Sequence, residues 1–199
     1  MNLENTLPMI GFIVVMVGTP GPNNLMLMAA GANAGFRRSL PHILGIVVGC
    51  QMMLLAVAVG LGQVLVRFPA LAVGLRVAGA AFLIWLAWQL VRRRHPDASN
   101  RASARPLTFR QAALFQWINP KAWMMIVTAI ATYTHPGDYA LSVAVVAGLF
   151  LLLSLPLIST WNLFGVALQG WLNQGRRLAF FNVAMAVLLL VSMYPTFIA

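Results

Sequence analysis

The chain has 199 residues, of which 61% are hydrophobic and only 8% are charged, and its mean hydropathy is +0.85. This composition cannot supply a polar surface around a soluble core, so lipid is the expected solvent. The formal net charge of +10 would favour nucleic acid as a partner of a soluble protein, but in a membrane protein the cations mark orientation. No nucleic-acid partner is therefore expected.

Six apolar segments are long enough to cross a membrane as helices, which takes about 20 residues each. In chain order they are residues 6–32, 40–64, 70–91, 111–133, 139–164 and 178–197. The polar stretch over residues 92–110 is rich in Arg, Ser and Pro and is expected to be a cytoplasmic loop. The sequence therefore predicts an all-α integral membrane protein with one transmembrane domain over residues 1–199.

The 92–110 loop divides the chain into two halves of three spans, residues 1–91 and 111–199. Three crossings are an odd number, so the second half must have the opposite membrane orientation, as in an inverted repeat. The connections after the first, third and fifth spans carry Arg37, Arg38, Arg92, Arg93, Arg94, Arg101, Arg105, Arg110, Arg176 and Arg177. Basic residues of short loops stay in the cytoplasm. Both termini are therefore predicted outside the cytoplasm, with the first span retained because no basic residue precedes it.

Each half begins with a span that proline interrupts. The interruptions are Thr19-Pro20-Gly21-Pro22-Asn23-Asn24 and Asn119-Pro120-Lys121. In helical transporters, broken helices at matching positions of two repeats indicate a substrate site near the bilayer midplane. The alternative is a simple kink, which is the expectation for the single prolines Pro156 and Pro195.

The breaks are expected to create a polar cavity. Proline lacks an amide proton and displaces the carbonyl four residues earlier, which should free the carbonyls of Met16, Gly18 and Gln116. Free carbonyls are tolerated at membrane depth only where protein or a water-filled cavity meets them. Asn23 and Asn24 are expected to cap the restarted helix through their side-chain oxygens. The positive end of that helix would suit a substrate carboxylate.

Lys121 is predicted to lie near the bilayer midplane, about 16 Å of helix inside the fourth span. An ionisable residue at that depth indicates a functional group that binds an anionic part of a substrate or changes its protonation during transport. If the span starts later, Lys121 is instead an anchor at the membrane interface. The predicted substrate site comprises Pro20, Gly21, Pro22, Asn23, Asn24, Asn119, Pro120 and Lys121.

Other polar side chains in the spans are secondary candidates, namely Gln51, Gln116, Asn162 and His42. Hydrogen bonding between helices is the alternative role for the three amides. The only acids, Glu4, Asp97 and Asp138, fall outside the predicted spans, so a proton would travel on a loop acid, a histidine, Lys121 or the substrate itself. The sequence contains no metal-ligand cluster and no catalytic or cofactor motif, so no metal, cofactor or enzyme activity is expected.

Several stretches occur in a recognisable order. They are Thr19-Pro20-Gly21-Pro22-Asn23-Asn24, Gly31, Gly35-Phe36-Arg37-Arg38, Gly45, Gly49, Gly79-Ala80-Ala81-Phe82-Leu83-Ile84-Trp85-Leu86-Ala87-Trp88 and Asn119-Pro120-Lys121-Ala122-Trp123. Together they resemble the bacterial LysE/RhtB family of amino-acid exporters over nearly the whole chain. The resemblance implies an inner-membrane exporter of amino acids or close derivatives, driven by the proton motive force. Pro-Gly-Pro-Asn-Asn is most similar to the branch that exports cysteine and O-acetylserine.

One position departs from many members of that family, which carry an aspartate where this chain has Asn23. The change removes a partner for a cationic group or a proton, and it favours neutral zwitterionic substrates over cations such as lysine. The sequence leaves open a channel or carrier for anions or other small solutes, and a membrane scaffold subunit that transports nothing. A small transporter of three plus three spans is also compatible with a homodimer.

Overall fold

The computed structural model describes residues 3–92, 105–172, 174, 176–192 and 194, and every regular element among them is a helix. The helices are α1 (Leu3–Gly18), α2 (Pro22–Ala34), α3 (Phe36–Ala56), α4 (Gly62–Arg67), α5 (Pro69–Arg92), α7 (Phe109–Ile118), α8 (Pro120–Tyr133), α9 (Tyr139–Ala167), α10 (Gln169–Leu172) and α11 (Arg177–Val191). A π-helical turn, Val57–Leu61, joins α3 to α4, and a 3-10 turn, Pro136–Asp138, precedes α9.

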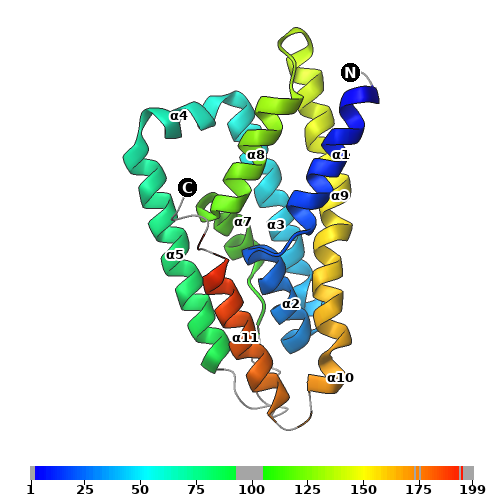
Figure 1. Cartoon of the computed structure of the whole chain (residues 1–199), viewed down its shortest axis with the longest axis vertical. Coiled ribbons are helices and arrows are strands. Elements are labelled where there is room, and N and C mark those ends of the chain that lie inside the picture. Colours follow the sequence, from blue (N-terminus) through cyan, green and yellow to red (C-terminus); the bar gives the residue numbers. More distant parts are fainter. Residues whose placement is uncertain (1–2, 93–104, 173, 175, 193, 195–199) are drawn as a thin grey trace.

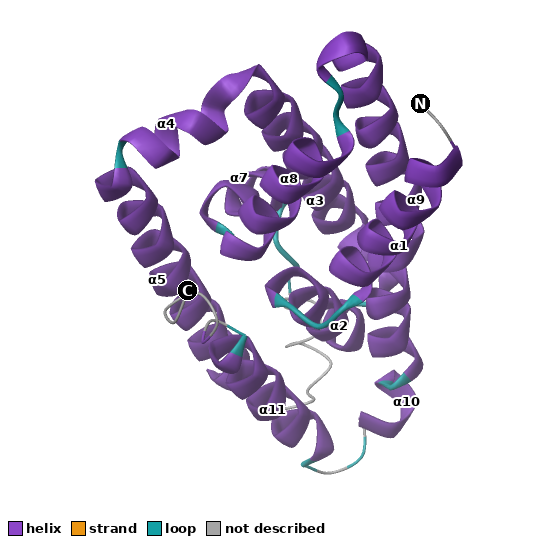
Figure 2. Ribbon diagram, turned by 45° about the horizontal axis from the view of Figure 1, so that its top comes forward, coloured by secondary structure: helices purple, strands orange, loops and turns teal. Residues whose placement is uncertain are grey.

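The helices run up and down along the long axis of the molecule (Figure 1). The α1–α2 pair descends from the N-terminus, α3 ascends, and α5 descends after the crosswise α4. In the second half of the chain α7 and α8 ascend, α9 descends to α10, and α11 ascends. Figure 2 shows that α5 and α11 form one wall and that α9 lies on the opposite side.

Three helical segments are long and apolar enough to cross a membrane: Phe36–Arg67, Pro69–Arg92 and Pro136–Leu172. Thr6–Gly18 and Pro22–Ala34 qualify together as one bent span, with 54° between them. The fourth expected span is divided into α7 and α8, and the sixth is represented by α11, which has 15 residues. Length and hydropathy thus identify up to four of the six expected spans. Residues 195–197 of the sixth lie outside the described part.

Helices α3 and α7 begin earlier than the sequence predicted, and the local chemistry explains both. The predicted second span starts at residue 40, but α3 starts at Phe36 because Gly35 adopts a φ of 83°, which lets the chain turn directly out of α2. The predicted loop runs to residue 110, but α7 starts at Phe109. A capping box closes its end, in which Gln111 N donates to Thr108 Oγ1 at 3.3 Å and Thr108 N donates to Gln111 Oε1 at 3.0 Å.

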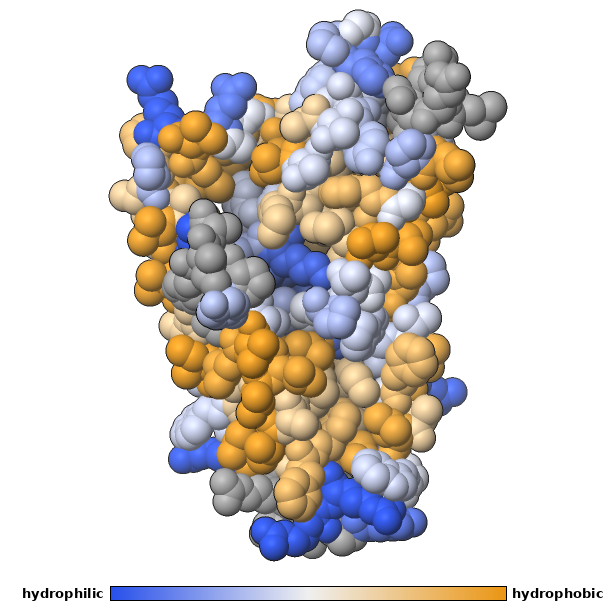
Figure 3. Space-filling model, in the orientation of Figure 1, coloured by the Kyte–Doolittle hydropathy of each residue, from blue (hydrophilic) through white to orange (hydrophobic). Residues whose placement is uncertain are grey.

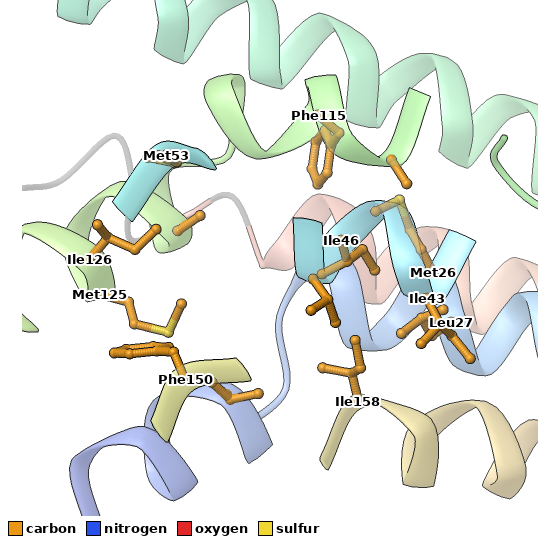
Figure 4. Close-up of a cluster of buried hydrophobic side chains, with 14 of the residues drawn as sticks. Met26, Leu27, Ile43, Ile46, Met53, Phe115, Met125, Ile126, Phe150 and Ile158 are labelled. Carbon is orange, nitrogen blue, oxygen red and sulfur yellow. The ribbon is translucent and has the colours of Figure 1, made fainter. Parts of the chain in front are cut away.

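The interior is a continuous apolar cluster to which the helices of both halves contribute. Figure 4 shows Met26 of α2, Ile46 of α3, Phe115 of α7, Met125 of α8 and Ile158 of α9 converging in it. The outer surface is also largely apolar, with a hydrophilic hollow at mid-height of the face seen in Figure 3. Exposed apolar side chains are unfavourable in water, so this surface is suited to lipid contact.

Glycines bring several pairs of helices into backbone contact. A Cβ at Gly165 of α9 would overlap the Met28 carbonyl of α2, and a Cβ at Gly31 of α2 would overlap the Asn162 carbonyl of α9. Gly49 of α3 has the same relation to α7, where a Cβ would lie 2.6 Å from the Ala113 carbonyl. Small residues that permit such approach are typical of helix pairs in membranes.

These contacts predict an unequal response to two identical substitutions in α9. Gly165→Ala must push α2 away from α9, whereas Gly148→Ala meets nothing within 4 Å and only gains helix propensity. We expect Gly165→Ala to lower the melting temperature of the purified protein in detergent by roughly 3–10 °C, and Gly148→Ala to leave it unchanged or slightly raised. Equal melting temperatures for the two variants would contradict the packing described here.

Candidate functional site

The two proline breaks lie side by side at the centre of the molecule and share a cavity. Its polar lining comes from Asn23, Asn24, Asn119, Lys121 and Ser154, and its apolar lining from α1, α3, α8 and α9. Its volume of about 40 Å³ holds water molecules rather than an amino acid. The helices around it must therefore separate before a solute of that size can bind.

Protein groups meet the carbonyls at the first break. Asn24 is buried, and its amide nitrogen donates to Val17 O at 2.7 Å and to Thr19 O at 2.8 Å. Trp161 Nε1 of α9 donates to Gly18 O at 3.0 Å. Gly21 occupies the N-cap position of α2 and no side chain caps that end. The expectation that Asn23 and Asn24 cap α2 through their oxygens is therefore wrong, because Asn24 turns its amide nitrogen back towards α1.

The other two carbonyls that proline was predicted to free, those of Met16 and Gln116, accept hydrogen bonds from residues three positions later. Thr19 Oγ1 donates to Met16 O at 3.5 Å, and Asn119 N donates to Gln116 O at 3.2 Å. At this second break Asn119 is the N-cap of α8, where its side-chain oxygen accepts from Lys121 N at 3.2 Å. A side-chain cap thus closes the restarted helix at the second break, although the sequence predicted one at the first.

Lys121 connects the two breaks. Its Nζ donates to Thr19 O at 3.0 Å, to Thr19 Oγ1 at 3.0 Å and to Pro20 O at 3.3 Å. An ammonium group has three donors, so these acceptors occupy its whole capacity. The side chain also lies against Gly21, where a Cβ would come within 2.8 Å of Lys121 Cδ. The only lysine of the chain therefore joins the second broken helix to the first by hydrogen bonds.

Asn23 and Gln116 form a second link between the halves. Asn23 Nδ2 donates to Gln116 Oε1 at 2.8 Å, and Gln116 Nε2 donates to Asn23 Oδ1 at 3.1 Å. Cys50 Sγ lies 3.5 Å from the same Gln116 oxygen. Gln116, a secondary candidate from the sequence, is thus placed next to the predicted site.

The remaining secondary candidates lie elsewhere. Gln51 donates from α3 to Ala147 O at 3.1 Å and Asn162 donates from α9 to Leu27 O at 2.8 Å, so both join helices rather than line the central cavity. His42 lines a different cavity. Sequence reasoning missed Ser154, because a lone serine in an apolar run carries no signal. It also missed Thr19 as the acceptor of Lys121, because that contact spans 102 residues.

The described residues contain no group of three or more His, Cys, Asp or Glu side chains that could hold a metal ion. The ordered donors and acceptors at the two breaks suit reversible binding of a polar solute.

The contact between Gly21 and Lys121 can be tested through the reactivity of the lysine. Gly21→Ala places a methyl group 2.8 Å from Lys121 Cδ and 3.0 Å from Nζ, whereas Gly18→Ala meets only Leu157 at 3.9 Å. Displacing Nζ from one carbonyl, a bond of about 1 kcal/mol, should raise the labelling rate of Lys121 by an amine-reactive reagent about fivefold. Peptide mass spectrometry separates this label from that of the N-terminal amine. The same labelling rate in Gly21→Ala and Gly18→Ala would refute the contact.

Comparison with known proteins shows the family of the chain. The cysteine/O-acetylserine efflux protein of Escherichia coli O139:H28 is 32% identical over 185 residues, which cover 90% of this chain and 90% of that protein. Proteins of the same name from Escherichia coli strain K12 and Shigella flexneri are 32% identical over 184 residues, 89% of this chain and 90% of theirs. No solved structure matches. The LysE type translocator family matches residues 14–192; the chain therefore belongs to the LysE family, whose members are membrane transporters and not enzymes.

Proposed function

We propose that the protein exports small neutral amino acids, or close derivatives of them, across the bacterial inner membrane, and that the substrate binds between the two proline breaks. The named relatives are efflux proteins for cysteine and O-acetylserine, and both compounds are zwitterions of this class. Support from the structure comes from the groups that meet at the breaks.

The observation that carries the proposal is the bonding of Lys121 to the carbonyls of Thr19 and Pro20. A zwitterionic amino acid can exchange partners with it. The substrate carboxylate takes the Lys121 ammonium, and the substrate ammonium takes the two carbonyls that Lys121 gives up. The exchange replaces neutral acceptors of Lys121 with a charged one, which strengthens its hydrogen bonds. Every polar group keeps a partner, as a site at membrane depth requires.

The same exchange couples binding to movement. Before binding, Lys121 of α8 joins the second half of the chain to Thr19 at the end of α1. When the substrate carboxylate binds Lys121, this link is replaced by one that passes through the substrate. A ligand shifts a conformational equilibrium only by its differential affinity for the two states. The link between the halves through the substrate forms only in the bound state, and it supplies that difference in affinity. Alternating access then proceeds as the two halves rock.

We assign six crossings to the chain, with α1–α2 and α7–α8 as the two broken spans of an inverted repeat. The helix ends that carry Arg37, Arg38, Arg92, Arg176 and Arg177 meet at the lower end of the molecule in Figure 1. We place that end in the cytoplasm, since basic residues of short loops stay there. Both termini then lie on the outer side.

Export is proposed to use the proton motive force. Among the side chains that the structure describes, the only acid is Asp138, in the turn before α9. The proposed proton carriers are His42, a loop acid, Lys121 or the ionisable groups of the substrate. We also propose a homodimer as the assembled form.

The second candidate function is transport of a simple anion, because Lys121 is a cation in a polar cavity. An anion would take the ammonium but would leave the carbonyls of Thr19 and Pro20 without a charged partner. The zwitterion is therefore the better match. A membrane scaffold that transports nothing does not require two hydrogen-bonded proline breaks.

Removing the Lys121 charge should stop export. We expect Lys121→Met to reduce efflux of preloaded O-acetyl-L-serine from cells at least tenfold, because an uncompensated carboxylate in the site costs more than 1.4 kcal/mol. Arg76→Met is the matched control, since it removes an exposed cation of α5 away from the cavity. Wild-type efflux should also fall with an uncoupler. Normal efflux by a well-inserted Lys121→Met protein would exclude this site.

The proposed orientation predicts where the two ends of the chain can be reached. Epitope tags fused to the N-terminus and to the C-terminus should both bind antibody in intact spheroplasts, while a tag inserted in the 92–110 loop should bind only after the membrane is permeabilised. Tags at the two termini that face opposite sides would rule out an even number of crossings.

A further inference from the structure

A second cavity of about 400 Å³ lies between α2, α3, α5, α11 and the segment that leads into α7. Met26, Ala29 and Ala30 line it from α2, and His42 lines it from α3. These residues follow the central cavity in the direction of the arginine-bearing helix ends. The larger cavity therefore occupies the half of the molecule that we place towards the cytoplasm.

His42 is an unusual group in this cavity. Its side chain is only 1% exposed, and neither ring nitrogen has a hydrogen-bond partner among the described protein groups. A buried polar atom without a partner costs about 1–3 kcal/mol, so such a group in a native fold calls for an explanation. Both ring nitrogens are themselves buried, so a solute in the cavity can supply the missing partner only if the ring turns towards it.

The groups around His42 are suited to a carboxylate. Gln89 makes no hydrogen bond within the described part of the chain, and Gln111 uses its oxygen to cap α7, which leaves its NH₂ group as a donor. Arg105 also lines this cavity. The N-terminal end of α7, which has 10 residues, also faces this region through Thr108, and helix N-termini favour anions. The described lining contains no acid.

The two cavities follow one another along the same two helices. On α2, Asn23 lines the central cavity and Met26 the lower one; on α3, Ile46 lines the central cavity and His42 the lower one. These steps of three and four residues are about one helical turn, or roughly 5 Å. Met26 and Ile46 are both buried and belong to the same apolar cluster (Figure 4). A flexible methionine at such a point can move aside.

We propose that the lower cavity is an entry station, in which His42 and the neighbouring donors hold the carboxylate of an amino acid before it passes Met26 and Ile46 to reach Lys121. The proposal rests on the proposed function, because it gives the same substrate a first binding place on the cytoplasmic side. His42 is thus a binding residue for the incoming substrate, separate from the Lys121 site.

The test uses a single cysteine in the lower cavity. Cys50 is the only cysteine, so Cys50→Ala with Ala30→Cys leaves one thiol near His42. In oriented vesicles of neutral lipid, a membrane-impermeant thiol reagent should react from the cytoplasmic face, and O-acetyl-L-serine should slow the reaction. The matched solute 2-aminoethyl acetate, which lacks only the carboxylate, should not. His42→Leu should raise the half-protecting concentration about tenfold, the loss expected for a hydrogen bond to a charged group, while His42→Gln should keep most of the protection.

His42→Leu removes two unpaired polar atoms, so the variant should fold at least as stably as the parent, and its melting temperature verifies this. Equal protection in parent and His42→Leu, or equal protection by the two solutes, would overturn the entry station. Lipid phosphate is also an oxyanion. If phosphatidylglycerol slows the labelling and O-acetyl-L-serine does not, the cavity binds lipid and the proposal is wrong. Protection is measured without transport, so His42-dependent protection in a chain that exports none of these amino acids would contradict only the proposed function.

Discussion

The arrangement of the centre depends on one requirement, that backbone carbonyls left open where a helix is broken must find partners inside a membrane protein. Lys121 and Asn24 meet this requirement at the first break, where both bond to Thr19 O. Because Lys121 belongs to the second half of the chain, satisfying the first broken helix also fixes the second one beside it. The proline break thus creates the need for these hydrogen bonds, and the same few bonds form the contact between the halves beside the polar cavity.

Helix α2 is the element through which most of these constraints act. Its successive turns bond to the second half through amides: Asn23 to Gln116, Leu27 O to Asn162, and Asn33 to Asn182 at 2.9 Å. Each of these bonds gives a partner to an amide that would otherwise be unsatisfied in an apolar interior, and this pairing stabilises the helix contact. The helix that follows the first break is therefore joined to the other half along its length by hydrogen bonds, so motion at the break is transmitted to that half.

The sequence was sufficient to locate the breaks, because proline has a definite local effect on a helix. It could not identify their partners. Lys121 meets Thr19 across 102 residues, and no local pattern specifies such a contact. The prediction that Asn23 and Asn24 cap α2 was wrong for a related reason. An asparagine side chain can bond through its oxygen or through its nitrogen. Because the bend leaves the Val17 carbonyl open, Asn24 donates its nitrogen to that carbonyl. The six-span inverted repeat stays a prediction, since α7 and α11 are too short to qualify alone.

The glycine contacts between helices have an uneven distribution. Gly31 and Gly165 bring the backbones of α2 and α9 together in the lower half, whereas Gly11 and Gly148 face nothing within 4 Å. Opening the lower half therefore means peeling backbone surfaces apart, and the attraction lost is dispersion, which salt does not screen. Lipid must then rearrange around the gap that opens between the separating helices. The turnover rate is accordingly expected to depend on the thickness and lateral pressure of the bilayer more than on ionic strength, which makes the composition of the membrane part of the transport mechanism.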